Sequence, residues 1–270
     1  MLIKVDCEVG LMFPNPTAVI WMLNLHPSVW PAVRIHEQFV ITPQVPVTEY
    51  NDVYGNRCGR AFVPAGLMIL RNSAVVEDSG LPDPQPWGVS QHPVQELPEE
   101  TLHFLLASRY CEVDSELKEL AWGKFSKVAP GWPLIMAICD FVHKHIRFDY
   151  MLARANRTAL EVYRERVGVC RDFTHLAVTL CRCMNIPARY CTGYLGDIGV
   201  PLDTAPMDFS AWFEVYLGGK WYATDARHNI PRIGRIPLAR GRDAADVALT
   251  TAFGFNTLAA FRVGTVEIAA

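Results

Sequence analysis

The chain has 270 residues, of which half are hydrophobic and a fifth are charged, and its net charge is −3. This length and composition suffice for one large or two smaller domains with a buried core, and they exclude an intrinsically disordered chain. The small negative charge, without any block of like charges, gives no electrostatic reason to expect a nucleic-acid partner.

The N-terminal segment does not have the pattern of a signal peptide. Lys4, Asp6 and Glu8 interrupt its apolar residues at every second position, whereas a signal peptide carries an uninterrupted apolar run. No other segment is long and apolar enough to cross a bilayer. We therefore expect a cytoplasmic protein with no membrane partner.

The cysteines are spread over the chain, at positions 7, 58, 111, 139, 170, 181, 183 and 191. They do not form the dense framework of a small secreted domain, so we expect reduced thiols that pack as small hydrophobic side chains. Cys139, His143 and His145 cannot converge on one ion, because His145 lies about 200° around a helix from His143. We expect no metal and no cofactor.

Residues 1–78 are predicted to form a small antiparallel β domain. Alternating apolar residues over 33–41 and a branched apolar run over 62–76 indicate strands, with turn residues at 52–56 between them. Residues 79–100 contain Pro82, Pro84, Pro86, Pro93 and Pro98. Proline resists both helix and central strand, so this segment is predicted to be a linker or an ordered coil along the surface.

Residues 101–270 are predicted to form a core of helices and strands. Ile135, Ile138, Cys139 and Val142 follow the i, i+3, i+4, i+7 spacing of one helical face. The ranges predicted as helices are 132–146, 158–167 and the segment from Cys170 to Met184. The ranges predicted as strands are 188–194, 211–217, 220–225 and 257–268, and Gly218-Gly219 joins the second and third into a hairpin.

Cys170 is the first candidate catalytic residue. Gly168 permits a tight backbone just before it, and the cysteine then begins a predicted helix. The free N–H groups and the dipole of a helix N-terminus favour a negative charge, so we expect a lowered thiol pKa and a thiolate nucleophile. Asp172 in the first turn suits the dipole and could fix the helix start. The alternative is a buried structural thiol.

Two further segments complete the candidate site. Ser210 precedes the first strand of the hairpin and Asp225 ends the second, and the tight turn can place both positions at one end of the hairpin. A base on the first strand and an orienting carboxylate on the second would then lie side by side. This arrangement is typical of a triad of cysteine, base and acid.

The segments 168–176 and 211–214, with the strand ending at Asp225, resemble the bacterial transglutaminase-like superfamily. The resemblance covers about residues 130–250 and, more weakly, the first 78 residues. It implies an α+β fold: a papain-like core, in which the helix bearing the cysteine packs on an antiparallel sheet, with an N-terminal antiparallel β domain. It also implies a Cys-His-Asp triad, with Cys170 as the nucleophile and Asp225 as the orienting acid.

Four further residues are candidates for substrate or oxyanion binding. The resemblance matches Tyr150 with the residue that assists the oxyanion. Trp212, close to position 210, could line the substrate cleft. Arg171 could meet an acidic group of the substrate, and His175 is either structural or substrate-facing.

Ser210 occupies the position where the family motif has the triad histidine. A serine hydroxyl cannot act as a general base near neutral pH, and losing a triad member costs about 10³–10⁶-fold in turnover. Three explanations are open: an engineered substitution, a natural pseudoenzyme that binds peptides or amides, or another histidine in the role. We favour the first two, because His175 would point about 140° away from Cys170 on its helix and His228 would lie beyond the strand end.

The predicted function is a cysteine peptidase or amidase that acts on a peptide or amide substrate through a Cys170 acyl-enzyme, inactive or impaired by Ser210. Hydrolysis is favoured because water is always present in an exposed cleft. A non-catalytic binding module and a transamidase remain the alternatives.

Overall fold

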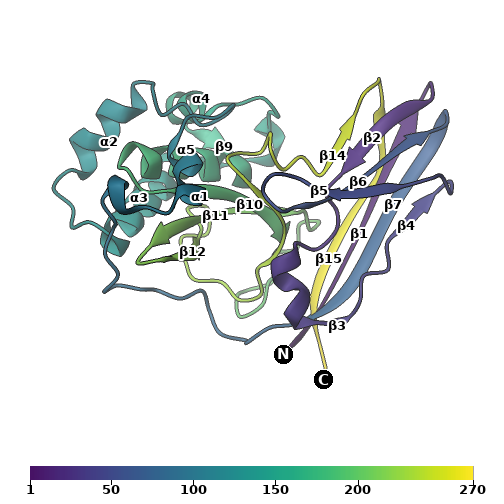
Figure 1. Cartoon of the computed structure of the whole chain (residues 1–270), viewed down its shortest axis with the longest axis horizontal. Helices are drawn as coiled ribbons and strands as arrows, with labels where there is room; N and C mark the ends of the chain where they lie inside the picture. Colours follow the sequence, from purple (N-terminus) through teal and green to yellow (C-terminus); the bar gives the residue numbers. More distant parts are fainter. Residues whose placement is uncertain (270) are drawn as a thin grey trace.

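The computed structural model describes residues 1–269. The molecule has two parts side by side, a β sandwich and a core of helices packed on a sheet (Figure 1). The predicted α+β fold is therefore confirmed. None of the helices in this described range is long and apolar enough to cross a membrane.

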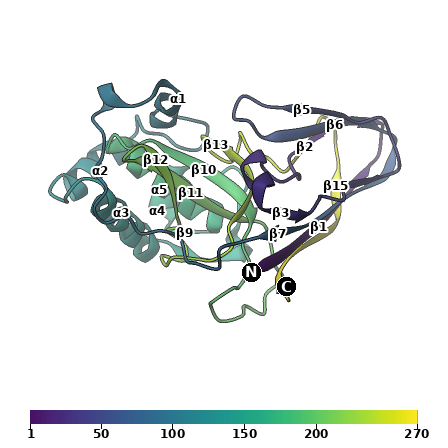
Figure 2. The same ribbon diagram turned by 60° about the horizontal axis from the view of Figure 1, so that its bottom comes forward.

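The β sandwich consists of two antiparallel sheets, which Figure 2 shows as two layers. The first sheet has the order β15 (Thr257–Ile268), β1 (Leu2–Phe13), β7 (Gly66–Glu77) and β3 (Val33–Ile35), and β4 (Val40–Thr42) also pairs with β7. The second has the order β14 (Thr250–Ala252), β2 (Thr17–Trp21), β6 (Arg57–Val63) and β5 (Thr48–Asn51). Alternate residues of β1, from Ile3 to Leu11, point into the space between the layers and are buried.

The C-terminal strand corrects the predicted domain boundary. Residues 257–268 form a strand as predicted, but β15 pairs with β1 along its whole length, from Leu2 opposite Ile268 to Met12 opposite Thr257. Strand β14 likewise pairs with β2. The chain thus returns to the β sandwich after the core, and the predicted core range of 101–270 is wrong from residue 250 onward.

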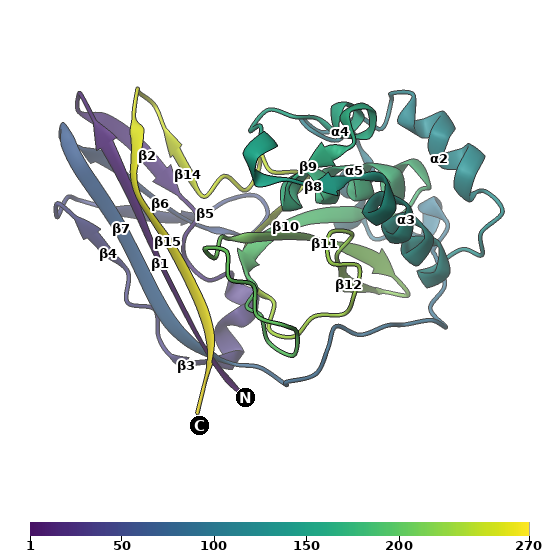
Figure 3. The same cartoon turned by 180° about the vertical axis from the view of Figure 1, so that it is seen from behind.

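The core is built on a four-stranded antiparallel sheet with the order β12 (Lys220–Thr224), β11 (Ser210–Leu217), β10 (Ala188–Tyr194) and β13 (Ile236–Gly241). Helix α5 (Cys170–Cys183) packs on β10 and β11, and α2 (Leu117–Phe125), α3 (Trp132–His145) and α4 (Ala159–Glu165) pack around it (Figure 3). Short strands β8 (Arg147–Phe148) and β9 (Val167–Gly168) pair in parallel just before α5. The predicted helices and hairpin are confirmed, whereas α2 has no counterpart among the predicted elements.

Residues 79–100 run from the β sandwich to the helices and contain little regular structure, with a 3₁₀ turn at Val94–Glu96 and the start of the short helix α1 (Glu99–Leu102). Side chains tie this segment to the core. The Asp83 carboxylate accepts hydrogen bonds from Arg235 Nε at 2.8 Å and from the Arg232 backbone N–H at 2.9 Å. The segment is therefore an ordered part of the surface that packs against the site described below.

The two parts of the molecule share one hydrophobic core. Tyr194, Phe209 and Leu238 from the core sheet and its loops are buried among residues of the β sandwich such as Val5 and Leu70. Burial of this apolar surface fixes the sandwich against the edge of the core sheet.

Gly59 allows the sandwich to close over a tryptophan. A methyl group added at Gly59 would lie 2.3 Å from the fully buried ring of Trp21. We expect Gly59→Ala to lower the free energy of unfolding by about 1–3 kcal/mol, the usual cost of overpacking. Urea unfolding measures this change.

Gly123→Ala provides a control of opposite sign for the Gly59 experiment. Gly123 lies within helix α2 and is exposed, and nothing lies near the position of an added methyl group. Alanine there should raise the free energy of unfolding by about 0.5–1 kcal/mol through helix propensity. Equal effects of the two substitutions would contradict the packing role of Gly59.

Candidate active site

Helix α5 begins at Cys170 because a buried carboxylate holds the preceding backbone. Asp172 Oδ2 accepts the N–H of Val169 at 2.8 Å and forms a buried ion pair with Arg157 Nη1 at 3.0 Å. A methyl group at Gly168 would lie 2.5 Å from the Asp172 Cβ. The glycine is therefore required by the close approach of Asp172, and Asp172 fixes the helix start, as the sequence suggests.

The Cys170 thiol is nearly enclosed, with 9% of the residue exposed, and it packs with Tyr190, Ala211 and Ala239. Burial raises its pKa to about 11, although the charge of Arg227 and the backbone N–H of Ala211 act in the opposite direction. The lowered pKa expected from the helix N-terminus is therefore wrong, because desolvation outweighs the favourable groups. The resting group is a protonated thiol, and attack on a carbonyl requires a base.

Ser210 begins strand β11, opposite Gly193 of β10. Its side chain is buried, and its Oγ has no hydrogen-bond partner among residues 1–269. Because the next residue is Ala211, whose N–H acts on the Cys170 thiol, position 210 lies beside the sulfur. The position at which the family motif has its histidine thus lies close to Cys170 along the chain fold, and it carries no base.

A cavity of about 150 Å³ opens beside this position. The residues around it that carry polar or charged side chains are Tyr150, Asp197, Asp203, Asp208, Ser210, Arg227, His228 and Arg232. Tyr150 lies in a 3₁₀ turn after β8 and is half-exposed; burial, and then the nearby Cys170, raise the pKa of its hydroxyl. The structure therefore places the predicted Tyr150 and Ser210 in one cavity next to Cys170.

Asp225 follows β12 and is buried. Its Oδ1 accepts the backbone N–H of Arg227 at 2.8 Å and that of His228 at 3.3 Å, and its Oδ2 accepts a hydrogen bond from His228 Nδ1 at 2.8 Å. Burial alone would raise the pKa of this carboxyl, but the His228 hydrogen bond and the charge of Arg235, 3.5 Å away, hold it well below its usual value. Asp225 is therefore ionised.

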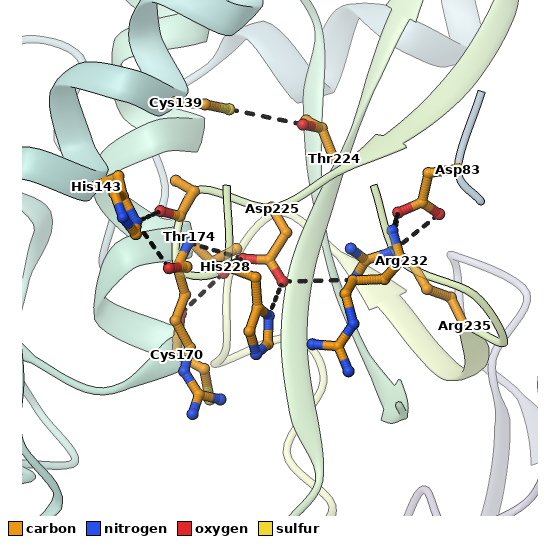
Figure 4. A network of polar contacts seen from close by, with 12 residues as sticks. Asp83, Cys139, His143, Cys170, Thr174, Thr224, Asp225, His228, Arg232 and Arg235 are labelled. Carbon is orange, nitrogen blue, oxygen red and sulfur yellow. Dashed lines mark hydrogen bonds and ion pairs between the residues drawn. The ribbon is translucent and has the colours of Figure 1, made fainter. Parts of the chain in front are cut away.

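The turn that carries His228 is anchored on both sides (Figure 4). The ring of His143 on α3 lies with its Nδ1 at 2.8 Å from the carbonyl oxygen of Arg227 and 3.2 Å from that of Ala226. Asn229, in the left-handed region at φ 54°, donates its N–H to the carbonyl of Asp225 at 2.9 Å. The position of the His228 ring is thus set by a rigid turn.

The three remaining candidates do not line the cavity at Ser210. Trp212 is buried beneath the guanidinium of Arg235, 5.3 Å from its ring centre, and borders a separate cavity of about 550 Å³ under residues 78–84. Arg171 donates to the carbonyl of Arg154. Neither side chain reaches the space beside position 210.

His175 is a structural residue. It is fully buried between Tyr110 and Tyr190, with ring centres 5.1 and 5.2 Å away, and its Nε2 accepts the N–H of Ala244 at 3.2 Å. Burial holds its pKa well below the ordinary value, so the ring is neutral. It supports the packing of α5 against the sheet.

His228 is a residue of the site that the sequence pattern did not favour. His228 does lie beyond the strand end, as the sequence predicts, but the structure brings its ring back against Asp225 and into the cavity that holds Ser210. The sequence did contain a signal for this position. An aspartate directly after a strand can accept the backbone N–H groups of the next residues and close a turn, which brings the third residue after it back beside the carboxylate. In residues 1–269, no group of three His, Cys, Asp or Glu side chains is placed to hold a metal ion.

Comparison with known proteins supports the fold. Residues 127–226, which include Cys170, Ser210 and Asp225, match the profile described as the transglutaminase-like superfamily. A provisionally assigned cysteine protease from Cytophaga hutchinsonii has a crystal structure with a TM-score of 0.84 and 28% identity, over 100% of this chain and 91% of that chain.

Two curated relatives are uncharacterized mycobacterial proteins. The one from Mycobacterium leprae is 34% identical over 107 residues, which is 38% of this chain and 38% of that protein. The one from Mycobacterium tuberculosis is 28% identical over 221 residues, 73% of this chain and 68% of that protein. The fold, the family profile and the structural neighbour together show that the chain has the fold of the transglutaminase-like superfamily.

Proposed function

We propose that the protein hydrolyses an amide or peptide bond through a thioester on Cys170. The observation that carries the proposal is the thiol at the N-terminus of α5, beside a cavity lined by Ser210, Tyr150 and the histidine that Asp225 holds. Such a nucleophile with an adjacent imidazole and carboxylate is the arrangement of thiol acyl transfer. The cysteine-protease neighbour from Cytophaga hutchinsonii supports the same class of reaction.

The reaction has two steps. The Cys170 sulfur attacks the amide carbonyl, the thiol proton passes through a base to the leaving amine, and the C–N bond breaks to leave a thioester. Water then attacks the thioester, giving the carboxylic acid and restoring the thiol. An amine in place of water would give transamidation, and hydrolysis is favoured because the charged cavity wall of Asp208 and Arg227 suits water.

Position 210 itself supplies no base, and a second imidazole there would add to the base that the cavity already holds. Ser210 cannot take the thiol proton, whereas a histidine there would lie beside the sulfur and direct its ring into the cavity. The chain as it stands should therefore turn over more slowly than a Ser210→His variant. We expect an increase of about 10-fold or more in kcat/KM for an amide substrate, within the range that general acid–base catalysis contributes.

The test combines a thiol probe with a panel of amide substrates. The unchanged chain, Ser210→His and the matched control Ser210→Ala are treated with iodoacetamide, and mass spectrometry identifies which cysteines react. Selective labelling of Cys170 with detectable amide turnover, faster in Ser210→His and unchanged in Ser210→Ala, is expected. Ligand binding without turnover or selective labelling in any of the three would instead identify a binding module.

A further inference from the structure

We propose that His228 is the catalytic imidazole of this protein and takes the role that Ser210 cannot perform. The proposal rests on the proposed function at Cys170 and identifies its general base. In the family motif the triad histidine stands at position 210, on the first strand of the hairpin. In this protein the imidazole follows the second strand. The acid, Asp225, stays the same.

The bond between Asp225 and His228 sets the protonation of the ring. A carboxylate can only accept, so His228 Nδ1 must be the donor in the 2.8 Å hydrogen bond. In the neutral ring the proton therefore resides on Nδ1, and Nε2 keeps its lone pair. This is the tautomer that a general base requires, with the carboxylate holding the ring and stabilising its positive form.

His228 lines a cavity that it shares with residues close to Cys170. His228 and Ser210 line the same cavity, whose volume of about 150 Å³ has room for a small reacting group between them. Arg227, the residue before His228, also lines this cavity, and its charge acts on the Cys170 thiol. Cys170, Asp225 and His228 appear together in Figure 4, the cysteine on α5 and the pair after β12.

A purely structural role does not account for the ring. The turn after β12 is already closed by the two backbone N–H groups that Asp225 Oδ1 accepts and by the Asn229 N–H. Among residues 1–269 the His228 ring makes one hydrogen bond, to this same Asp225. The ring therefore ties the turn to no additional residue. It keeps 23% of its surface exposed, whereas Asp225 keeps 1%. A partly exposed ring on an anchored turn is suited to proton transfer.

His228 carries the proton between the sulfur and the amide nitrogen in this proposal. His228 Nε2 takes the proton of the Cys170 thiol as the sulfur–carbon bond forms. The resulting imidazolium donates that proton to the amide nitrogen as the C–N bond breaks. In the second step, Nε2 takes a proton from the attacking water and returns one to the sulfur as the thioester opens.

His228→Asn separates the catalytic role from a structural one. The asparagine amide can donate to Asp225 from nearly the position of Nδ1, so the turn is kept, but it offers no base. We expect kcat/KM to fall about 10²–10⁴-fold, with an unchanged urea midpoint. The rate of Cys170 labelling by iodoacetamide at pH 7 should fall in this variant, and labelling should become fast only where the thiol itself ionises, near pH 11. His36→Ala, an exposed histidine on the β sandwich, is the control and should change nothing.

Chemical rescue gives a second measurement. In a His228→Gly variant, added imidazole should restore part of the turnover and of the labelling at pH 7, and it should have no effect on the unchanged chain. If the variants fail to fold, His228→Gln with near-UV circular dichroism replaces them.

The outcomes separate this inference from the proposed function. Turnover that depends on Cys170 but is equal in His228→Asn overturns the role of His228 and leaves the proposed function intact. Absence of turnover in the unchanged chain, with labelling that still depends on His228, overturns the hydrolase and leaves the thiol–imidazole pair. Labelling and turnover that are both unchanged in His228→Asn overturn the inference.

Discussion

A Cys170→Ala variant is expected to lose all amide turnover while it remains folded. Removing the nucleophile of a triad costs on the order of 10⁶-fold in kcat, because no other group can form the acyl intermediate. The free energy of unfolding should change by no more than about 1 kcal/mol, since the thiol is small and packs against alanines. Steady-state kinetics and urea unfolding of the same preparation measure the two quantities.

Cys183→Ala is the matched control for this experiment. Cys183 is also a buried cysteine, at the other end of helix α5, with its Sγ 3.7 Å from the carbonyl of Val113. It should keep full activity and show a similar small change in stability. Residual turnover of more than about 1% in Cys170→Ala would show that another group carries the chemistry.

An Arg157→Met variant is expected to lose about 3–5 kcal/mol of stability. Arg157 is 4% exposed and forms the closer of two ion pairs with the fully buried Asp172, so methionine would leave that carboxylate with only the Arg171 guanidinium, 3.6 Å away. Arg157 also donates to Glu165 at 2.9 Å and to the carbonyl of Leu152 at 2.9 Å. Because Asp172 fixes the backbone before Cys170, activity should fall together with stability. Urea unfolding and amide turnover test both parts.

Two further variants identify the cause of the Arg157 effect. Arg164→Ala removes an exposed pair with Glu116, whose two side chains are 59% and 52% exposed, and it should leave the urea midpoint almost unchanged. Asp172→Asn in the Arg157→Met background neutralises the orphaned charge and keeps an oxygen for the Val169 N–H. It should recover much of the loss. A double variant no more stable than Arg157→Met would exclude the buried charge as the cause.

Local patterns in the amino-acid sequence were sufficient for the fold class and for the order of the site residues. The face of α3, the helix that begins at Cys170 and the hairpin at Gly218-Gly219 all follow from periodicities or turn preferences within a few residues. The expectation that positions 210 and 225 share one end of the hairpin follows from strand geometry, whereas their relation to Cys170 came from the family resemblance. These features are local, and each depends on backbone preferences that one chain segment expresses alone.

Three features depended on contacts between distant segments. The pairing of β15 with β1 joins the two ends of the chain, and no local pattern specifies the partner of a strand. The raised pKa of Cys170 comes from burial under β10, β11 and β13, which outweighs the helix N-terminus. The place of His228 depends on the Asp225 carboxylate and on His143 of α3, which together turn the chain back toward the cavity. Desolvation and long-range packing decide such features, and both exist only when the whole chain is folded.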